Sequence, residues 1–201
     1  SLFEKCLKLL AGRSGQILDY SSLANDVGVD AKTIRHWTSI LEASFILFKL
    51  PAYFENFGKR VIKSPKFYFT DIGLLCHLLN IREPAQVSRD PLVGNIFENL
   101  VVMEFVKETL NRGRPAELYF FRDSNGNEVD LLIPDRPSLT AIEIKSAATF
   151  KMSRLKSLQR FTKIARTPIQ NHLIYNGEPT SLSNGTTALP YNAISELFSP
   201  F

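Results

Sequence analysis

The chain has 201 residues, of which 44% are hydrophobic and 11% aromatic, so we expect a globular core rather than a disordered polymer. The 24 Lys and Arg residues outnumber the 20 acids and give a formal charge of +4, which mildly favours an anionic partner. Two cysteines and three histidines show no zinc-ligand spacing, and no apolar run approaches the roughly 20 residues of a membrane span. We therefore expect one or two domains, a reducing cytoplasmic location and no membrane partner.

The first 45 residues predict three helices. Apolar residues recur at helical spacing over 2–10, a cap at 19–22 precedes a second helix over 23–27, and Asp30 caps a third over 31–45. The apolar stripe of the third helix consists of Ile34, Trp37, Leu41 and Phe45. Because a glycine turn separates the second and third helices, their spacing is that of a helix-turn-helix.

Two strands are expected after the third helix, over residues 46–50 and 66–69, and a long basic segment connects them. This order is typical of a winged helix. A DNA-binding version would place Lys32, Thr33, Arg35 and His36 in the major groove, and the wing residues Lys59, Arg60, Lys63 and Lys66 on phosphates. The alternative is a helical core that packs against another domain or a partner, which the small number of charges on the exposed helix face slightly favours.

The middle of the chain predicts two further helices and a linker. Asp71 is placed to cap a helix over 72–79, and the polar stretch 81–91, with two prolines, is the expected linker between two domains. A long helix with a broad apolar face is expected over 92–110. Glu98 lies beside that apolar face, where an acid is ordinarily a solvated surface residue.

A meander of three strands is expected next. Residues 118–122 form the first strand and residues 123–127 the turn that leads into a second strand over 127–133. The chain then returns over 139–145 after a turn at 134–138. Both arms of this last hairpin are rich in β-branched residues.

The expected register of the hairpin brings acidic residues together. With a loop at 135–138, Asp130 lies opposite Glu143, and Glu128 lies opposite Lys145. Two opposed carboxylates repel each other and lose hydration when the sheet is covered, so they need a positive counter-charge. Lys145 supplies one charge, and a bridging Mg²⁺ would supply more, because Mg²⁺ takes one or two carboxylates and keeps several waters.

The last 50 residues predict a crossover that extends the sheet. A basic helix is expected over 152–161, a strand over 172–175, a turn at 184–185 and a short final helix over 195–198. The basic residues in and around the first of these helices, with no acid among them, are Lys151, Arg154, Lys156, Arg160, Lys163 and Arg166. A phosphate backbone would bind such a helix, although a charged run is also the ordinary composition of a solvated face.

The acidic residue Asp130, with Glu143 and Lys145 on the next strand, resembles the core of the PD-(D/E)XK nuclease superfamily. The helix that carries Glu98 resembles the first helix of that superfamily, which also bears an acid. A longer pattern, formed by residues 66–74, Phe97 with Glu98, residues 119–122 and residues 128–130, resembles the DUF4143 domain, the C-terminal half of a group of prokaryotic AAA-type ATPases.

The resemblance implies a mixed α/β fold. A winged-helix-like domain over 1–85 would precede a restriction-endonuclease-like domain over 86–201, a mixed sheet flanked by helices. Because the sequence contains no P-loop motif and begins without Met, we expect ATP to bind only in a preceding ATPase domain that these residues do not include. That ATPase domain is the first expected partner, and DNA the second.

The resemblance also implies a metal-dependent endonuclease. Asp130 and Glu143 would coordinate Mg²⁺ or Mn²⁺, Lys145 would orient the attacking water or stabilise developing charge, Glu98 would act through a water, and Gln159 would join them. One alternative is a catalytically silent module that couples the ATPase to DNA or to a protein. In another, the winged helix binds DNA and the second domain only dimerises; the sequence leaves open whether the chain forms a homo-oligomer.

Overall fold

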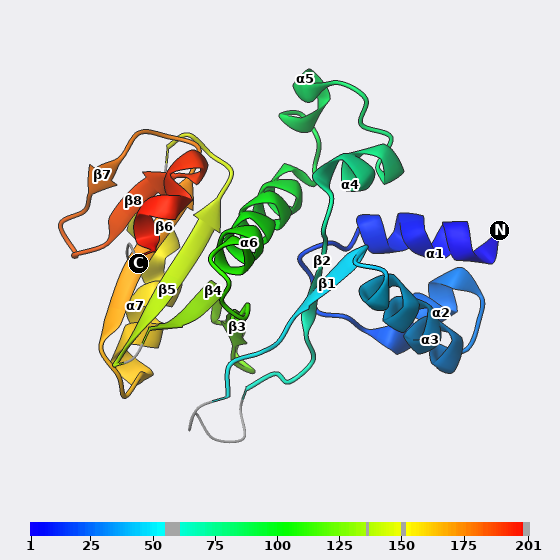
Figure 1. Ribbon diagram of the computed structural model, residues 1–201, viewed down its shortest axis with the longest axis horizontal. Coiled ribbons are helices and arrows are strands. Elements are labelled where there is room, and N and C mark those ends of the chain that lie inside the picture. The colour runs from blue at the N-terminus through cyan, green and yellow to red at the C-terminus, as the bar shows by residue number, and fades with distance from the viewer. Residues whose placement is uncertain (55–60, 136, 150–151, 199–201) are drawn as a thin grey trace. The chain divides into compact units, whose positions relative to one another are not determined.

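The structure is a computed structural model that describes residues 1–54, 61–135, 137–149 and 152–198, without the side chains of residues 153 and 154 (Figure 1). The chain forms two compact units. The first consists of Ser1–Leu50 and Ser64–Met103, and the second consists of Pro51–Lys63 and Glu104–Phe201. The two units therefore interleave along the chain, whereas the sequence suggested consecutive segments that meet between residues 85 and 86.

The first unit contains five helices and a two-stranded antiparallel sheet among its described residues. They are α1 (Leu2–Ala11), α2 (Tyr20–Val27), α3 (Ala31–Ala43), β1 (Leu47–Leu50), β2 (Lys66–Phe69), α4 (Ile72–Leu78) and α5 (Pro84–Val87). The predicted caps are confirmed, because the side chains of Asp19, Asp30 and Asp71 each accept a hydrogen bond from the first turn of α2, α3 and α4. Three helices and a strand pair thus follow in the order expected from the sequence.

Two predictions about the secondary structure of this unit were wrong. Phe45 was assigned to the apolar stripe of α3, but the helix ends at Ala43, and Phe45 is 83% exposed in the left-handed backbone region, with φ of 56°. The expected linker over 81–91 instead contains α5 and packs into the unit. Ile81 is buried, because apolar residues at both ends of this stretch contact the helical core.

Helix α6 (Val93–Asn111) has 19 residues, and its first part belongs to the first unit while its last part belongs to the second. Its length and position match the helix expected over 92–110. None of the described helices, α6 included, is long and apolar enough to cross a membrane.

The second unit is built on a six-stranded mixed sheet with the strand order β3-β4-β5-β6-β8-β7. The strands are β3 (Tyr119–Arg122), β4 (Glu128–Asp135), β5 (Ser138–Lys145), β6 (Ile169–Tyr175), β7 (Thr180–Ser181) and β8 (Thr187–Pro190). Strands β3, β4 and β5 form the predicted antiparallel meander, while β5, β6 and β8 are parallel. The predicted crossover between β5 and β6 is confirmed.

Helix α7 (Lys156–Ile164), preceded by the short helix η2 (Met152–Leu155), covers one face of this sheet (Figure 1). Leu155, Leu158 and Phe161 are buried, as the sequence predicted, and the Phe161 ring lies 4.9 Å from that of Phe121. The final helix η3 (Tyr191–Leu197) packs against β6 and β8. The sheet is therefore covered by apolar side chains, so polar side chains within it need partners.

The hairpin of β4 and β5 has the predicted register. Pro134 pairs with Leu139, and the ladder runs from Leu131–Ile142 to Asp135–Ser138, two residues further into the expected turn on the β4 side. Because side chains alternate between the faces of a strand, this register decides which residues meet at its open end.

Candidate functional site

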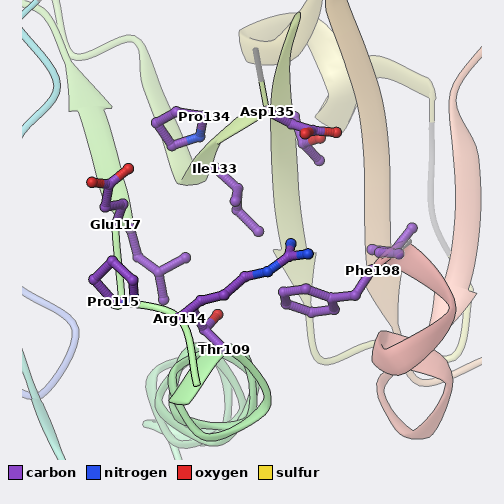
Figure 2. A pocket seen from close by; sticks show the side chains of 11 residues that line it. Thr109, Arg114, Pro115, Glu117, Ile133, Pro134, Asp135 and Phe198 are labelled. Atoms are coloured by element: carbon purple, nitrogen blue, oxygen red, sulfur yellow. The ribbon is translucent and has the colours of Figure 1, made fainter. Parts of the chain in front are cut away.

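A cavity of about 220 Å³ lies beside the Asp135 end of this hairpin (Figure 2). Thr109 from α6, Thr140 from β5 and Phe198 after η3 line it, and Arg114 extends into it toward Phe198. Its walls are partly apolar and partly charged, with acids as well as the arginine. This mixed lining does not indicate one ligand chemistry, and the acidic residues singled out in the sequence lie at the other end of the hairpin.

At that other end, β4 bulges at Asp130. The pairing of β3 with β4 shifts by one residue between Tyr119 and Phe121, so β4 holds one extra residue in the stretch that includes Asp130. A bulge commonly redirects a side chain next to a functional site. Here the Asp130 Oδ2 atom accepts a hydrogen bond of 2.8 Å from the backbone N–H of Ile144, beyond the last ladder pair. This hydrogen bond fixes the Asp130 carboxylate beside the backbone of β5.

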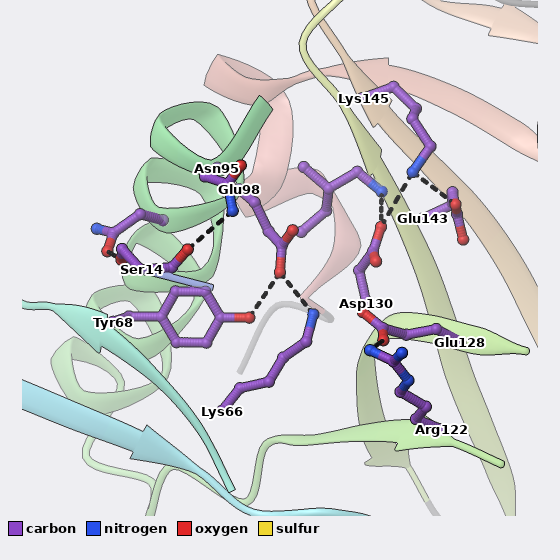
Figure 3. Close-up of polar contacts among 12 residues, drawn as sticks. Ser14, Lys66, Tyr68, Asn95, Glu98, Arg122, Glu128, Asp130, Glu143 and Lys145 are labelled. Atoms are coloured by element: carbon purple, nitrogen blue, oxygen red, sulfur yellow. Dashed lines mark hydrogen bonds and ion pairs between the residues drawn. The ribbon is translucent and has the colours of Figure 1, made fainter. Parts of the chain in front are cut away.

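Lys145 and Glu143 complete a cluster with Asp130 (Figure 3). The Lys145 Nζ atom lies 2.6 Å from Glu143 Oε1 and 3.4 Å from Asp130 Oδ2. Glu143 is 5% exposed and Asp130 is 7% exposed, so both acids are buried within the sheet. The structure thus brings together three residues that the sequence singled out, and we call them the carboxylate–lysine cluster.

Glu143 is the least satisfied member of this cluster. Its Oε2 atom is buried and has no hydrogen-bond partner among the described residues. Burial, and secondarily the nearby charge of Asp130, raises the pKa of Glu143 to about 8, although Lys145 acts in the opposite direction. One lysine therefore does not compensate two buried carboxylates.

The donor atoms of the cluster suit a hard divalent cation. Carboxylate oxygens are the ligands that Mg²⁺ and Mn²⁺ prefer, and one buried oxygen of Glu143 has no hydrogen-bond partner among the described residues. The described residues contain no group of three or more His, Cys, Asp or Glu side chains that could hold a metal. A cation here would take two carboxylates from the chain and several further ligands from water, which is the usual coordination of Mg²⁺.

Glu128 was expected opposite Lys145, and the structure shows an ion pair of Glu128 with a residue that the sequence did not single out. The Arg122 Nη1 atom lies 3.1 Å from Glu128 Oε2, and these two residues are direct cross-strand partners on β3 and β4. Glu128 also raises the pKa of Glu143 slightly through its charge. Arg122 could have been found from the sequence, because it ends the strand that pairs with the acid-rich start of β4.

Glu98 lies in the first unit, on α6. Its Oε1 atom accepts hydrogen bonds from Lys66 Nζ at 2.8 Å and from the Tyr68 hydroxyl at 2.7 Å (Figure 3). Lys66 is 2% exposed, so the prediction that it contacts phosphates from a wing was wrong. A buried lysine needs a nearby acid, and Glu98 provides it. The acid is therefore not the solvated helix residue that its position beside an apolar face suggested.

Asn99, the residue after Glu98, fastens α6 to β2 in the first unit. Its side chain accepts from the backbone N–H of Phe69 and donates to the Phe69 carbonyl, both at 2.8 Å, as a neighbouring strand would. The Ser14 hydroxyl donates to the same Asn99 oxygen at 2.6 Å. Sequence reasoning missed Asn99, although an asparagine on the apolar face of a predicted helix was the available signal.

Two known sequence families match this chain. The profile described as "Domain of unknown function (DUF4143)" matches residues 93–194, about half of the chain, and covers the whole carboxylate–lysine cluster. The chain belongs to the DUF4143 family. A second profile, "Domain of unknown function (DUF8612)", matches residues 1–85.

This DUF4143 chain is similar to uncharacterised proteins of Mycobacterium bovis and Mycobacterium tuberculosis. It is 30% identical to each over 188 residues, which is 92% of this chain. The match covers 41% of each mycobacterial protein, so the chain spans less than half the length of these relatives. No solved structure was found to match it.

The nucleic-acid-binding residues expected in the first unit of this DUF4143 protein lie on one exposed helix. Lys32, Arg35 and His36 are exposed on α3, and the Arg35 guanidinium lies 4.3 Å from the centre of the Tyr20 ring. The aromatic contact holds one face of the guanidinium and leaves its edge toward solvent. These side chains are accessible to a ligand.

The residues expected on the basic helix of the second unit are only partly described. Lys156 and Gln159 are exposed on α7. Lys151 lies outside the described residues, as does the side chain of Arg154. The described part of this helix therefore offers Lys156 to a ligand, and no hydrogen bond joins Gln159 to the carboxylate–lysine cluster among the contacts of the described residues.

Proposed function

We propose that the carboxylate–lysine cluster is a Mg²⁺- or Mn²⁺-dependent phosphodiesterase site that acts on nucleic acid, with DNA as the expected substrate. The observation that carries the proposal is the buried Oε2 atom of Glu143, which has no hydrogen-bond partner among the described residues, in a carboxylate whose pKa is raised by burial and by the charge of Asp130. Such a pair is unfavourable without added positive charge, and groups with strongly shifted pKa values concentrate at functional sites.

Each residue of the cluster has a distinct part in this proposal. Asp130, Glu143 and the backbone carbonyl of Ile144 would hold the cation, which supplies Lewis-acid polarisation of the phosphate and acidification of a bound water. Lys145, 2.6 Å from Glu143 in the structure, would donate to the phosphate oxygens while negative charge develops on them. A water molecule would form the new P–O bond and release one proton to solvent, and the bridging P–O bond would break as the leaving oxygen takes up one proton from solvent.

Two further residues complete the proposed site. The resemblance assigns Glu98 a contribution through a water molecule and Gln159 a contribution from α7. Both assignments rest on the resemblance to the PD-(D/E)XK superfamily, as does the proposal that the two units are a winged helix and a nuclease-like domain. The contacts of Glu98 with Lys66 and Tyr68 support a structural part for this acid at least as strongly.

The exposed basic residues are proposed to hold the substrate backbone. Lys32, Arg35 and His36 would contact DNA from α3, and Lys151, Arg154 and Lys156 from the segment around α7. The greater length of the mycobacterial relatives supports a second part of the proposal, in which a preceding ATPase domain is a partner of this DUF4143 module. Self-association of the module belongs to the same proposal.

A cleavage assay tests the proposed activity. Labelled single-stranded, duplex and branched DNA, and RNA, are incubated with the native chain and with Asp130→Asn and Lys145→Ala in Mg²⁺ or Mn²⁺. Cleavage by the native chain should fall at least about 100-fold in both variants, because each removes a charge that acts on the reacting phosphate. Lys107→Ala is the matched control, since Lys107 pairs with Glu104 on the exposed surface of the same unit.

One observation favours a second candidate, the catalytically silent module. Lys145 contacts both acids and Ile144 N–H donates to Asp130, so most polar atoms of the cluster already have partners. In that case Lys145→Ala would lower the stability of the fold, and no substrate would be cleaved by any of the proteins. Equal residual cleavage in the native chain and both variants would support the same conclusion.

A further inference from the structure

Arg122 has a position in the second unit that the proposed chemistry does not use. It is the last residue of β3 and the direct cross-strand partner of Glu128, to which its Nη1 atom donates over 3.1 Å. Glu128 lies two residues before Asp130 on β4, and its charge is felt at Glu143. The guanidinium is therefore held at the border of the carboxylate–lysine cluster, next to the open end of the β4–β5 hairpin (Figure 3).

The donors of Arg122 are only partly satisfied. Its Nε–H group is buried and has no hydrogen-bond partner in the described part of the chain, while 40% of the side chain as a whole is exposed. A buried donor that is left unpaired is unfavourable, and each such group in a native structure calls for an explanation. The exposed part of the Arg122 side chain, rather than the covered Nε–H group, is accessible to an acceptor on a ligand.

The chemistry of the group identifies the ligand. A guanidinium presents five N–H donors in a planar fork that matches the oxygens of a phosphate, and it stays charged at any physiological pH. The contact with Glu128 fixes the orientation of the fork in advance, so little side-chain entropy is lost when a second anion binds. Carboxylates of the cluster are positioned for a cation, so Arg122 is the complementary element for the anion.

We propose that Arg122 binds a phosphate group of the nucleic-acid substrate beside the carboxylate–lysine cluster, with Glu128 as the residue that positions it. This inference rests on the proposed function and names a substrate-binding residue of that same site. The end of β3 and the start of β4 would then contact the substrate.

The test compares Arg122→Gln and Arg122→Lys with the native chain. Binding of labelled DNA is measured by fluorescence anisotropy in EDTA over a range of salt concentrations, and KM and kcat are measured in Mn²⁺. We expect Arg122→Gln to weaken DNA binding and raise KM roughly tenfold, and to lower the slope of log K against log salt by about one contact. Arg122→Lys should keep most of the salt slope but not the affinity, because a lysine lacks the fork.

Arg112→Gln is the matched control, because Arg112 forms an ion pair of 2.7 Å with Glu108 in the same unit and has no assigned part in the site. We expect the Arg112→Gln variant to lose stability, as Arg122→Gln does, and to bind DNA like the native chain. Native affinity, KM and salt slope in both Arg122 variants would overturn the assignment and leave Arg122 as the structural partner of Glu128. A native chain that neither binds nor cleaves any nucleic acid would instead overturn the proposed function, and this inference with it.

Discussion

Two glutamates, half-buried Glu98 in the first unit and buried Glu143 in the second, each have a lysine beside them, and they differ in their hydrogen bonding and in the charges around them. In the first unit, one oxygen of Glu98 receives hydrogen bonds from both Lys66 and Tyr68. In the second unit, Glu143 has Lys145 at one oxygen, an unpartnered second oxygen and Asp130 as a neighbouring like charge. The lysine–glutamate pair of the first unit is therefore compensated by its neighbours, whereas that of the second unit keeps a buried carboxylate oxygen without a donor among the described residues.

The comparison indicates which buried acids stabilise the fold and which are candidates for ligand binding. A buried acid with enough donors has its charge compensated within the fold, so its removal should act on stability. A buried acid without them makes the folded state less stable until a cation or proton arrives, so its removal should act on ligand binding. The predictions below separate these two outcomes.

The largest effect on stability is expected at Lys66. Lys66→Ala leaves the Glu98 carboxylate without its charged partner, and we expect the free energy of unfolding to fall by about 3 kcal/mol. Urea denaturation of the native chain and of the variant measures this difference in the free energy of unfolding. Lys107→Ala, in an exposed lysine–glutamate pair, should change the same quantity by less than about 0.5 kcal/mol. A loss at Lys66 no larger than at Lys107 would show that the buried pair does not hold the first unit together.

A smaller loss of stability is expected when Asn99, which joins the first part of α6 to β2, is replaced. Asn99→Ala removes two hydrogen bonds to the backbone of Phe69 and leaves both Phe69 groups unpaired, which should cost about 2 kcal/mol. Hydrogen exchange at the Phe69 amide should accelerate in the variant more than exchange at amides of β5. Equal acceleration in β2 and β5 would contradict a local role.

The pH dependence of stability tests whether Glu143 lacks a compensating charge. Because the folded-state pKa of Glu143 is raised from 4.5 to about 8, its contribution is fully present below about pH 4.5 and is lost as the pH rises toward 8. In EDTA, the free energy of unfolding should fall over this range by at most about 1.4 kcal/mol per pH unit from this group. Glu143→Gln should flatten the decline and be the more stable protein at pH 9. An identical pH profile in both proteins would show that Glu143 is not left uncompensated.

Much of the cluster could be predicted from the sequence, because it depends on local rules. A short loop fixes the register of a hairpin, and the register places Asp130, Glu143 and Lys145 together. The caps of three helices and the buried stripe of α7 also follow from spacing alone. Membership of the DUF4143 family agreed with the motif residues that suggested it.

The remaining features depend on contacts between distant residues. Lys66 lies 32 residues from Glu98, and no local pattern shows that a lysine at the start of a strand will be buried against a helix. The placement of Pro51–Lys63 in the second unit has the same cause, since Tyr53 N–H pairs with the Phe120 carbonyl far along the chain. Phe45 was misplaced because helical spacing continues past the point where α3 ends.

The central claim is that the carboxylate–lysine cluster of this DUF4143 protein holds a divalent cation. Its most direct test is a titration of the native chain with Mn²⁺, in which free metal is followed by electron paramagnetic resonance and compared with Asp130→Asn and Glu143→Gln. The account predicts one Mn²⁺ per native chain, competition by Mg²⁺, and affinity at least about tenfold weaker in each folded variant. No binding by the native chain at millimolar Mn²⁺, or equal binding by all three proteins, would contradict it.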